Sequence, residues 1–185
     1  MVNEHIIATA ITRAKHTTSA EIVAVVSKAS DTYQSYVLLY GLMLGSMIAM
    51  GLWAERFVTD FPLLLAVQLG VTMMFSLLPW LHKPLVRLVP KHVRYRRAAH
   101  RAFEEYLVVT RHISAATPVL LFYVSLAERY AHILPGRSVR EKIPDREWDA
   151  VIAEFTASMK TAGLERACTG AISRMAAMLA AHFPR

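Results

Sequence analysis

The sequence predicts an α/β protein with a small mixed sheet and packed helices, interrupted after its first strand by a transmembrane helical hairpin. Short β-branched apolar runs alternate with segments whose apolar residues recur at helical spacing. Two uncharged runs, each about 20 residues long, stand between the first and the second predicted strand. Hydrophobic residues reach 55% of the 185-residue chain and charged residues only 19%, so apolar surface exceeds the needs of one water-soluble core.

The chain begins with a predicted helix and a predicted strand. The apolar residues of the helix share one face, as their spacing of three and four residues requires. They are Ile6, Ile7, Ala10, Ile11 and Ala14. Residues 17–19, Thr-Thr-Ser, end this helix. Residues 21–26 follow, and after Glu21 they form an unbroken apolar run, which predicts a strand covered on both faces.

The two uncharged runs predict helical membrane spans over about residues 36–54 and 61–81. The second run is richer in Leu, Val and Phe, so we expect it to be the stronger span. Only residues 55–60 separate the two, and so short a connection requires a tight antiparallel hairpin. Trp53 and Trp80 fall near the ends of the spans, where amphipathic rings favour the headgroup layer.

Gly41 and Gly45 form a GxxxG motif in the first span. Without side chains at these positions, a second helix can approach the backbone closely. We expect the motif to pack on the second span, with Gly70 opposite, and a dimer between two copies of the chain is the alternative.

A cluster of basic residues follows the second span, and no acidic residue interrupts it before Glu104. It includes Lys83, Arg87, Lys91, Arg94, Arg96 and Arg97. The positive-inside rule places this flank in the cytoplasm, and two crossings return the chain to the same side. We therefore expect a two-pass protein of the bacterial inner (plasma) membrane with both termini cytoplasmic.

The same basic residues predict partners. Near a bilayer each one attracts anionic lipid headgroups by roughly 1 kcal/mol. Clustered cations also occur in nucleic-acid-binding proteins, but their position beside a span already accounts for them here, so no nucleic acid is expected. The predicted organisation is a discontinuous cytoplasmic domain over residues 1–31 and 95–185, with residues 32–94 as hairpin and basic juxtamembrane segment.

The second part of the domain contains two further predicted strands. Residues 117–125 predict a buried strand, with Pro118 at its start, where no ladder donor is needed. Residues 130–134 predict a third strand, close enough in sequence to pair antiparallel with the second. A helix over residues 95–112 precedes both, with Ala98, Ala102, Tyr106 and Val109 on one face.

Two predicted helices complete the chain. Asp145 is expected to cap the first, because its carboxylate can accept a bond from a free backbone N–H, and Gly163 is expected to end it. The buried stripes are Trp148, Ile152, Phe155 and Met159 in the first helix, and Leu164, Cys168, Ile172, Met175 and Leu179 in the second.

Several short stretches, in their order and spacing, resemble a known family. They are residues 18–22, 101–103 and 119–129, Trp148, and residues 182–184. The chain resembles the TPM domain family, and more closely its bacterial branch with an inserted two-helix transmembrane hairpin. The resemblance implies a compact α/β sandwich and, since some members are described as phosphatases, acidic residues that hold Ca²⁺ or Mg²⁺.

Candidate metal ligands follow from this resemblance. Asp31 and Glu128 are the choices, because each follows a predicted buried strand at the end where side chains leave the sheet. Where related chains have an Asp-containing turn, residues 134–137 read Leu-Pro-Gly-Arg, which removes a carboxylate ligand. The residues by themselves assign no cofactor and no catalytic residue, and no HExxH, GxSxG or phosphate-binding glycine loop is present.

The sequence thus favours a membrane-anchored TPM-like protein with a non-catalytic interaction or accessory role, binding lipid headgroups or a protein partner. The alternative is a divalent-cation-dependent phosphatase acting at the membrane surface.

Overall fold

The computed structural model describes residues 4–31, 33–78, 88–111, 113–114 and 117–185. The chain divides into two compact units, one formed by Met1–Ser30 with Tyr95–Arg185 and the other by Asp31–Arg94. The described residues form seven helices and a small three-stranded mixed sheet, which confirms the α/β class.

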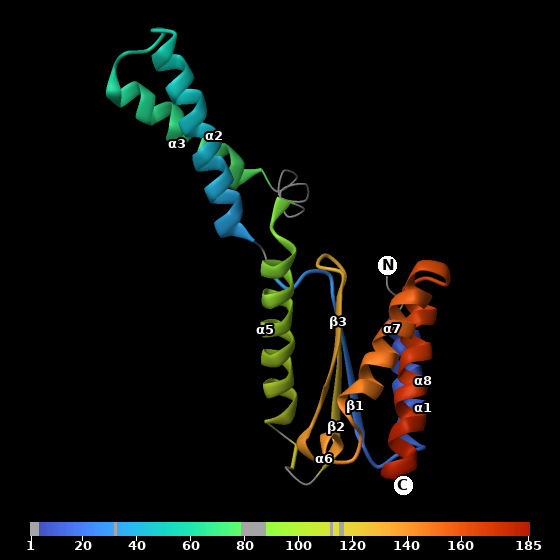
Figure 1. The fold of residues 1–185 in the computed structure, drawn as a ribbon. Coiled ribbons are helices and arrows are strands. Elements are labelled where there is room, and N and C mark those ends of the chain that lie inside the picture. The colour runs from blue at the N-terminus through green and yellow to red at the C-terminus, as the bar shows by residue number, and fades with distance from the viewer. Residues whose placement is uncertain (1–3, 32, 79–87, 112, 115–116) are drawn as a thin grey trace. The chain divides into compact units, whose positions relative to one another are not determined.

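The sheet has the strand order β1-β2-β3 (Figure 1). Strand β1 (Glu21–Ser27) runs parallel to β2 (Val119–Ser125), and β2 runs antiparallel to β3 (Tyr130–Pro135). All seven residues of β2 are buried, as expected for a central strand. The prediction that the first strand is covered on both faces is wrong, because β1 is an edge strand in which only Ile22 is buried.

Three helices cover one face of the sheet, namely α1 (Glu4–Lys15), α7 (Asp145–Thr161) and α8 (Leu164–His182) (Figure 1). Their apolar stripes meet the side chains of alternate strand residues, as the two-residue period of a strand requires. The core formed in this way includes Ile22, Leu120, Phe122, Trp148, Phe155, Cys168, Ile172, Met175 and Leu179. The apolar stripe of the last helix is therefore as predicted, apart from Leu164, which is half-buried.

Helix α5 (Lys91–Thr110) lies on the other face of the sheet (Figure 1). Ala98 and Ala102 are fully buried on this helix. The helix begins four residues before the predicted start at Tyr95. Helix α6 (Arg137–Arg140), a single turn after β3, was not predicted.

The predicted cap of α7 is wrong. The residue before the helix is Pro144, in an extended conformation, and Asp145 is the first helical residue. Asp145 and Glu147 in the first turn still stabilise the helix, because negative charge complements the positive end of the helix dipole. Gly163, with a φ of 81°, lies directly before α8 and links the two helices.

The Asp31–Arg94 unit consists mainly of α2 (Gln34–Ala54) and α3 (Phe61–Leu77), an antiparallel pair joined by residues 55–60. A Cβ atom on Gly45 would lie 2.8 Å from the backbone oxygen of Gln68, and one on Gly41 would lie 3.2 Å from the Cα atom of Thr72. The two backbones are therefore in contact. Gly70 is not opposite these glycines, since a Cβ atom there would meet nothing within 4 Å.

Only α2, among the described helices, is long and apolar enough to cross a membrane. Its 21 residues extend about 31 Å, whereas the 17 residues of α3 extend about 25 Å, at a rise of about 1.5 Å per residue. This does not support the expectation that the second run is the stronger span. The predicted end of that span, together with Trp80, Lys83 and Arg87, lies outside the described residues.

Candidate functional site

The parallel strands β1 and β2 end at the same edge of the sheet, with Ser27 opposite Ser125. The segments that follow stay side by side, because the Leu126 N–H donates to the Ser27 carbonyl and the Ala127 N–H to the Lys28 carbonyl, each at 3.0 Å. In α/β sheets, ligands bind preferentially outside the carboxyl ends of the strands. The residues at this edge therefore form the candidate site.

Glu128 is the central polar residue of this edge. It is 2% exposed, and its two carboxylate oxygens accept the backbone N–H of Ser30 at 3.1 and 3.2 Å. The hydroxyl of Ser125 also donates to this carboxylate. The Ser30 hydroxyl shares a hydrogen bond of 2.9 Å with the hydroxyl of Tyr123, which is fully buried. Glu128 thus ties the turn after β2 to the segment after β1.

This network fixes an unusual backbone conformation at the next residue. Arg129 has a φ of 53°, and its N–H donates to the Leu126 carbonyl at 3.3 Å to close the turn into β3. A non-glycine residue in the left-handed region costs about 1 kcal/mol or more and persists where surrounding contacts determine it. The hydrogen bonds of Glu128 supply those contacts.

A cavity of about 450 Å³ lies between this turn and α7. Its apolar lining comes from Val124, Leu126, Ala131, Phe155 and Met159, and its polar lining from Ser125, Arg129, Tyr130, Thr156 and Lys160. The lining contains two cations and no acidic residue. Burial raises the pKa of Tyr130, and the charge interaction with the nearby Tyr123 raises it further by a smaller amount. The side chain therefore stays a neutral phenol. The cavity accordingly favours an anionic or polar ligand with an apolar part.

The two predicted metal ligands fall in different units of the structure. Glu128 belongs to the α/β unit, where its carboxylate receives the hydrogen bonds described above. Asp31 belongs to the Asp31–Arg94 unit, and its carboxylate accepts the Tyr33 N–H at 3.3 Å. In the part of the chain that the structure describes, no group of three or more His, Cys, Asp or Glu residues could hold a metal ion. A cation site that uses both carboxylates stays a prediction.

Four of the predicted membrane-surface residues lie on the first half of α5, and Lys83 and Arg87 lie outside the described residues. The four are Lys91, Arg94, Arg96 and Arg97. The first turn of α5 has no acidic residue, although a helix start favours negative charge. The acids of α5 are further along, where Arg101 approaches Glu104 at 3.1 Å and Glu105 at 2.8 Å. The Glu104 hydrogen bond and the charge of Glu105 raise the pKa of Arg101. The start of α5 thus carries a local excess of positive charge that suits an external anion.

Sequence reasoning missed Ser30, Tyr123, Ser125 and Lys160. A signal was present for Ser125 alone, because this serine ends a strand after an apolar run. The pairing of Ser30 with Glu128 could not be found from spacing, since 98 residues separate them. Ser125 is 1% exposed and bonded to a buried carboxylate, so the pair supports the turn at the edge of the cavity.

Comparison with known proteins gives a fold likeness. No protein-family description matches the chain, and no curated protein matches it. The NMR structure of the BA42 protein from the psychrophilic bacterium Bizionia argentinensis is similar, with a TM-score of 0.56 and 14% sequence identity. The match covers 98% of this chain and 80% of that one. At this identity, the likeness extends to the fold alone.

Proposed function

We propose that this chain is a membrane-anchored α/β protein of the bacterial inner membrane with a non-catalytic interaction or accessory role. The Asp31–Arg94 unit would cross the bilayer twice, and the α/β unit would act on the cytoplasmic side. One observation carries the proposal: α2 packs on the backbone of α3 through small residues, and both helices direct their long apolar side chains outward.

The distribution of side chains in this unit is the reverse of that in a water-soluble helix pair. Gly41, Gly45 and Ala49 are buried on α2, whereas Met47 is 64% exposed and Met50 66% exposed. Helix α3 has no buried residue. Water-soluble proteins rarely leave a contiguous apolar surface of this kind uncovered. Lipid tails would cover it, and small residues at the interface are typical of helices that associate in membranes.

Polar contacts between and within the two helices support the same interpretation. The Gln68 side-chain amide donates to the Ser46 hydroxyl at 3.0 Å, and that hydroxyl donates to the Leu42 carbonyl at 2.8 Å. The Thr72 hydroxyl likewise bonds the Gln68 carbonyl at 2.8 Å. Polar side chains on apolar helices find partners within the helix or across to the next helix when no water is available.

The sheet limits the number of crossings. Strand β1 precedes α2, strand β2 follows α3, and the two strands pair in parallel from Glu21 to Ser27. Residues before and after the helices therefore lie on one side of any bilayer, so the number of crossings is even. If α2 spans, the segment that begins with α3 must return. An α3 of about 25 Å is short of the roughly 30 Å hydrocarbon core, a mismatch that local thinning of the bilayer accommodates.

Charge sets the orientation of the proposed hairpin. The connection between the helices carries Glu55, Arg56 and Asp60, whereas the flank after α3 carries six basic residues before Arg101 and no acid. Positive flanks stay in the cytoplasm, so the connection would face the periplasm. The cations at the start of α5 would then face the anionic cytoplasmic leaflet.

The proposed role at the surface is binding. Glu128 and Ser125 are buried and hold a turn, while Arg129 and Lys160 line an open cavity beside it. Charged groups beside an apolar cavity lining can bind a ligand or partner without a nucleophile or a general base. Lipid headgroups and an acidic protein segment both fit this chemistry.

Fractionation and crosslinking test the proposal. Membranes containing the full chain would be washed with alkaline carbonate, and we expect the protein to stay in the pellet. Crosslinking in intact membranes should capture a partner or anionic lipid, and a chain released by carbonate would refute the anchor. Hydrolysis of a chromogenic phosphate ester with Mg²⁺ or Ca²⁺ that Glu128→Ala abolishes in a folded protein would replace the non-catalytic role with that of a phosphatase.

A further inference from the structure

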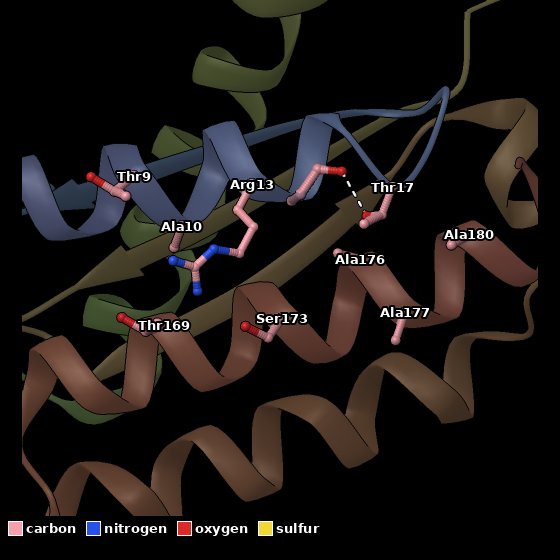
Figure 2. A pocket seen from close by; sticks show the side chains of 10 residues that line it. Thr9, Ala10, Arg13, Thr17, Thr169, Ser173, Ala176, Ala177 and Ala180 are labelled. Atoms are coloured by element: carbon pink, nitrogen blue, oxygen red, sulfur yellow. Dashed lines mark hydrogen bonds between the residues drawn. The ribbon is translucent and has the colours of Figure 1, made fainter. Parts of the chain in front are cut away.

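A second cavity lies in the α/β unit, and none of its lining residues lines the first. It is a groove of about 530 Å³ between α1 and α8 (Figure 2). Arg13 and Thr9 of α1 face Thr169 and Ser173 of α8 across it, and the remaining lining is mainly alanine from both helices. Small-molecule sites in proteins have volumes of about 300 to 1,000 Å³, so the groove is of suitable size.

Arg13 supplies the charge of the groove. Figure 2 shows its side chain extending from α1 toward α8, so that the guanidinium lies over the gap between the helices. No acidic residue lines the groove, and within the described part of the chain the guanidinium has no hydrogen bond or ion pair. Five N–H donors are therefore available to an anion.

The hydroxyls of Thr169 and Ser173 differ in whether their proton is already donated within the protein. Thr169 donates its proton to the Glu165 carbonyl at 2.8 Å, as helical threonines commonly do. Ser173, one turn further along α8, has no hydrogen-bond partner among the described residues. Its O–H can therefore donate to the same anion as Arg13. An alternative role for Arg13 is to complement the helix dipole from the last turn of α1. That role does not account for the unbonded hydroxyl of Ser173 or for the open volume of the groove.

Alanine on both walls determines the shape of the remaining space. Ala10 and Ala14 on α1 face the groove, as do Ala176, Ala177 and Ala180 on α8. Longer side chains at these positions would fill the space between the helices. A slim apolar body can lie along these methyl groups, and burying each of its CH₂ groups contributes about 0.8 kcal/mol.

We propose that this groove binds a small anionic amphiphile, with a phosphate or carboxylate head on Arg13 and Ser173 and a slim apolar chain along the alanines. Phosphate and carboxylate match the planar fork of a guanidinium. The ligand could come from the solution, as a short-chain acid or phosphate ester, or from a membrane, as a single-chain lipid. The site belongs to the α/β unit and does not depend on the proposed membrane anchor.

Calorimetric titration of the full chain in zwitterionic lipid nanodiscs tests this site, with empty nanodiscs subtracted. The probes are hexyl phosphate, hexanoate, inorganic phosphate and hexanol. We expect hexyl phosphate to bind most tightly, because only it combines a doubly charged head with a chain. Equal binding of inorganic phosphate or of hexanol would overturn the proposal, since it would remove the need for the chain or for the charge.

Two variants locate the binding. Arg13→Gln should weaken hexyl phosphate binding by about tenfold or more, because a charge-assisted bond is lost. Ala177→Leu places a large side chain in the groove at an exposed position and should abolish binding without disturbing the core. Arg166→Gln is the matched control, since Arg166 is exposed on α8 outside the groove lining, and it should leave affinity unchanged.

Circular dichroism and thermal unfolding verify that each variant is folded. Unchanged binding by folded Arg13→Gln and Ala177→Leu would refute the site. Once the site is confirmed, a decyl phosphate probe distinguishes a ligand from solution from a ligand that comes from a membrane. If decyl phosphate binds more tightly than hexyl phosphate and Ala177→Leu abolishes that binding, the natural ligand is a lipid. If the two phosphates bind equally, the natural ligand is a short soluble molecule.

Discussion

Glu128 joins two segments of the chain that are 98 residues apart. A buried carboxylate is tolerated only where hydrogen bonds replace its hydration, and here the Ser30 N–H and the Ser125 hydroxyl do so. The consequence reaches the next residue, because the turn that Glu128 holds is the one that places Arg129 at the edge of a cavity. This residue therefore connects the stability of the sheet edge to its binding surface.

Replacing Glu128 by alanine should lower the free energy of unfolding by about 1 to 3 kcal/mol, since it leaves a part-buried N–H and a buried hydroxyl without their acceptor. Thermal unfolding of the full chain in mild detergent measures this loss. The control is Glu154→Ala, which removes a carboxylate that is 63% exposed and 3.2 Å from Arg174. Exposed pairs contribute little, so equal losses for the two variants would contradict the account.

Cys168 provides a test of burial in the core. Burial raises the pKa of its thiol from 9.0 to about 11, so the folded protein favours the protonated form. The stability associated with this shift is complete below about pH 9 and is lost as the pH rises toward about 11. Denaturant unfolding between these pH values should show a steeper loss for the natural chain than for Cys168→Ala. Parallel pH profiles would contradict the buried position.

The helices and strands show what the spacing of apolar residues can and cannot predict. The spacing of apolar residues predicted all three strands, α1, α5, α7 and α8, because it reports which side of an element faces a core. It could not predict that β1 is an edge strand, since strand order depends on contacts between distant segments. Pro144 occupies the position expected for the cap Asp145, and a shift of one residue at a helix start lies within the resolution of such patterns.

The contact between α2 and α3 gives a similar lesson. The glycine motif identified the close face of α2, but the partner expected at Gly70 is instead the backbone near Gln68 and Thr72. Which residue lies opposite a glycine depends on the register of two helices, and the sequence of either helix alone does not contain it. The hydrogen bond between Gln68 and Ser46, which joins the two helices, was likewise not predicted.

Replacing Gly45 by alanine should therefore weaken the helix pair. The new Cβ atom would lie 2.8 Å from a backbone oxygen of α3, so the helices must separate. Gly51→Ala on the same helix is the matched control, because its Cβ atom would meet nothing within 4 Å. Alanine favours helix formation by about 1 kcal/mol over glycine, so the control should be neutral or stabilising. Thermal unfolding in detergent compares the two, and equal midpoints would argue against close packing at Gly45.

At the scale of the whole molecule, one compact unit is inserted into another. The α/β unit is built from Met1–Ser30 and Tyr95–Arg185, and the parallel pairing of β1 with β2 crosses the insertion. The uncharged runs of the sequence are confined to one stretch, and the cations follow it. The arrangement requires that both ends of the inserted unit remain on one side of a bilayer. The proposed two-pass anchor rests on this requirement.

Accessibility of single cysteines in spheroplasts tests the anchor most directly. In a Cys168→Ala background, Thr59→Cys would mark the connection between α2 and α3, and Arg185→Cys would mark the C-terminus; both positions are exposed. A membrane-impermeant maleimide should label Thr59→Cys in intact spheroplasts and Arg185→Cys only after lysis. Labelling of both positions before lysis, or of neither, would contradict a hairpin that crosses the membrane twice with its α/β unit in the cytoplasm.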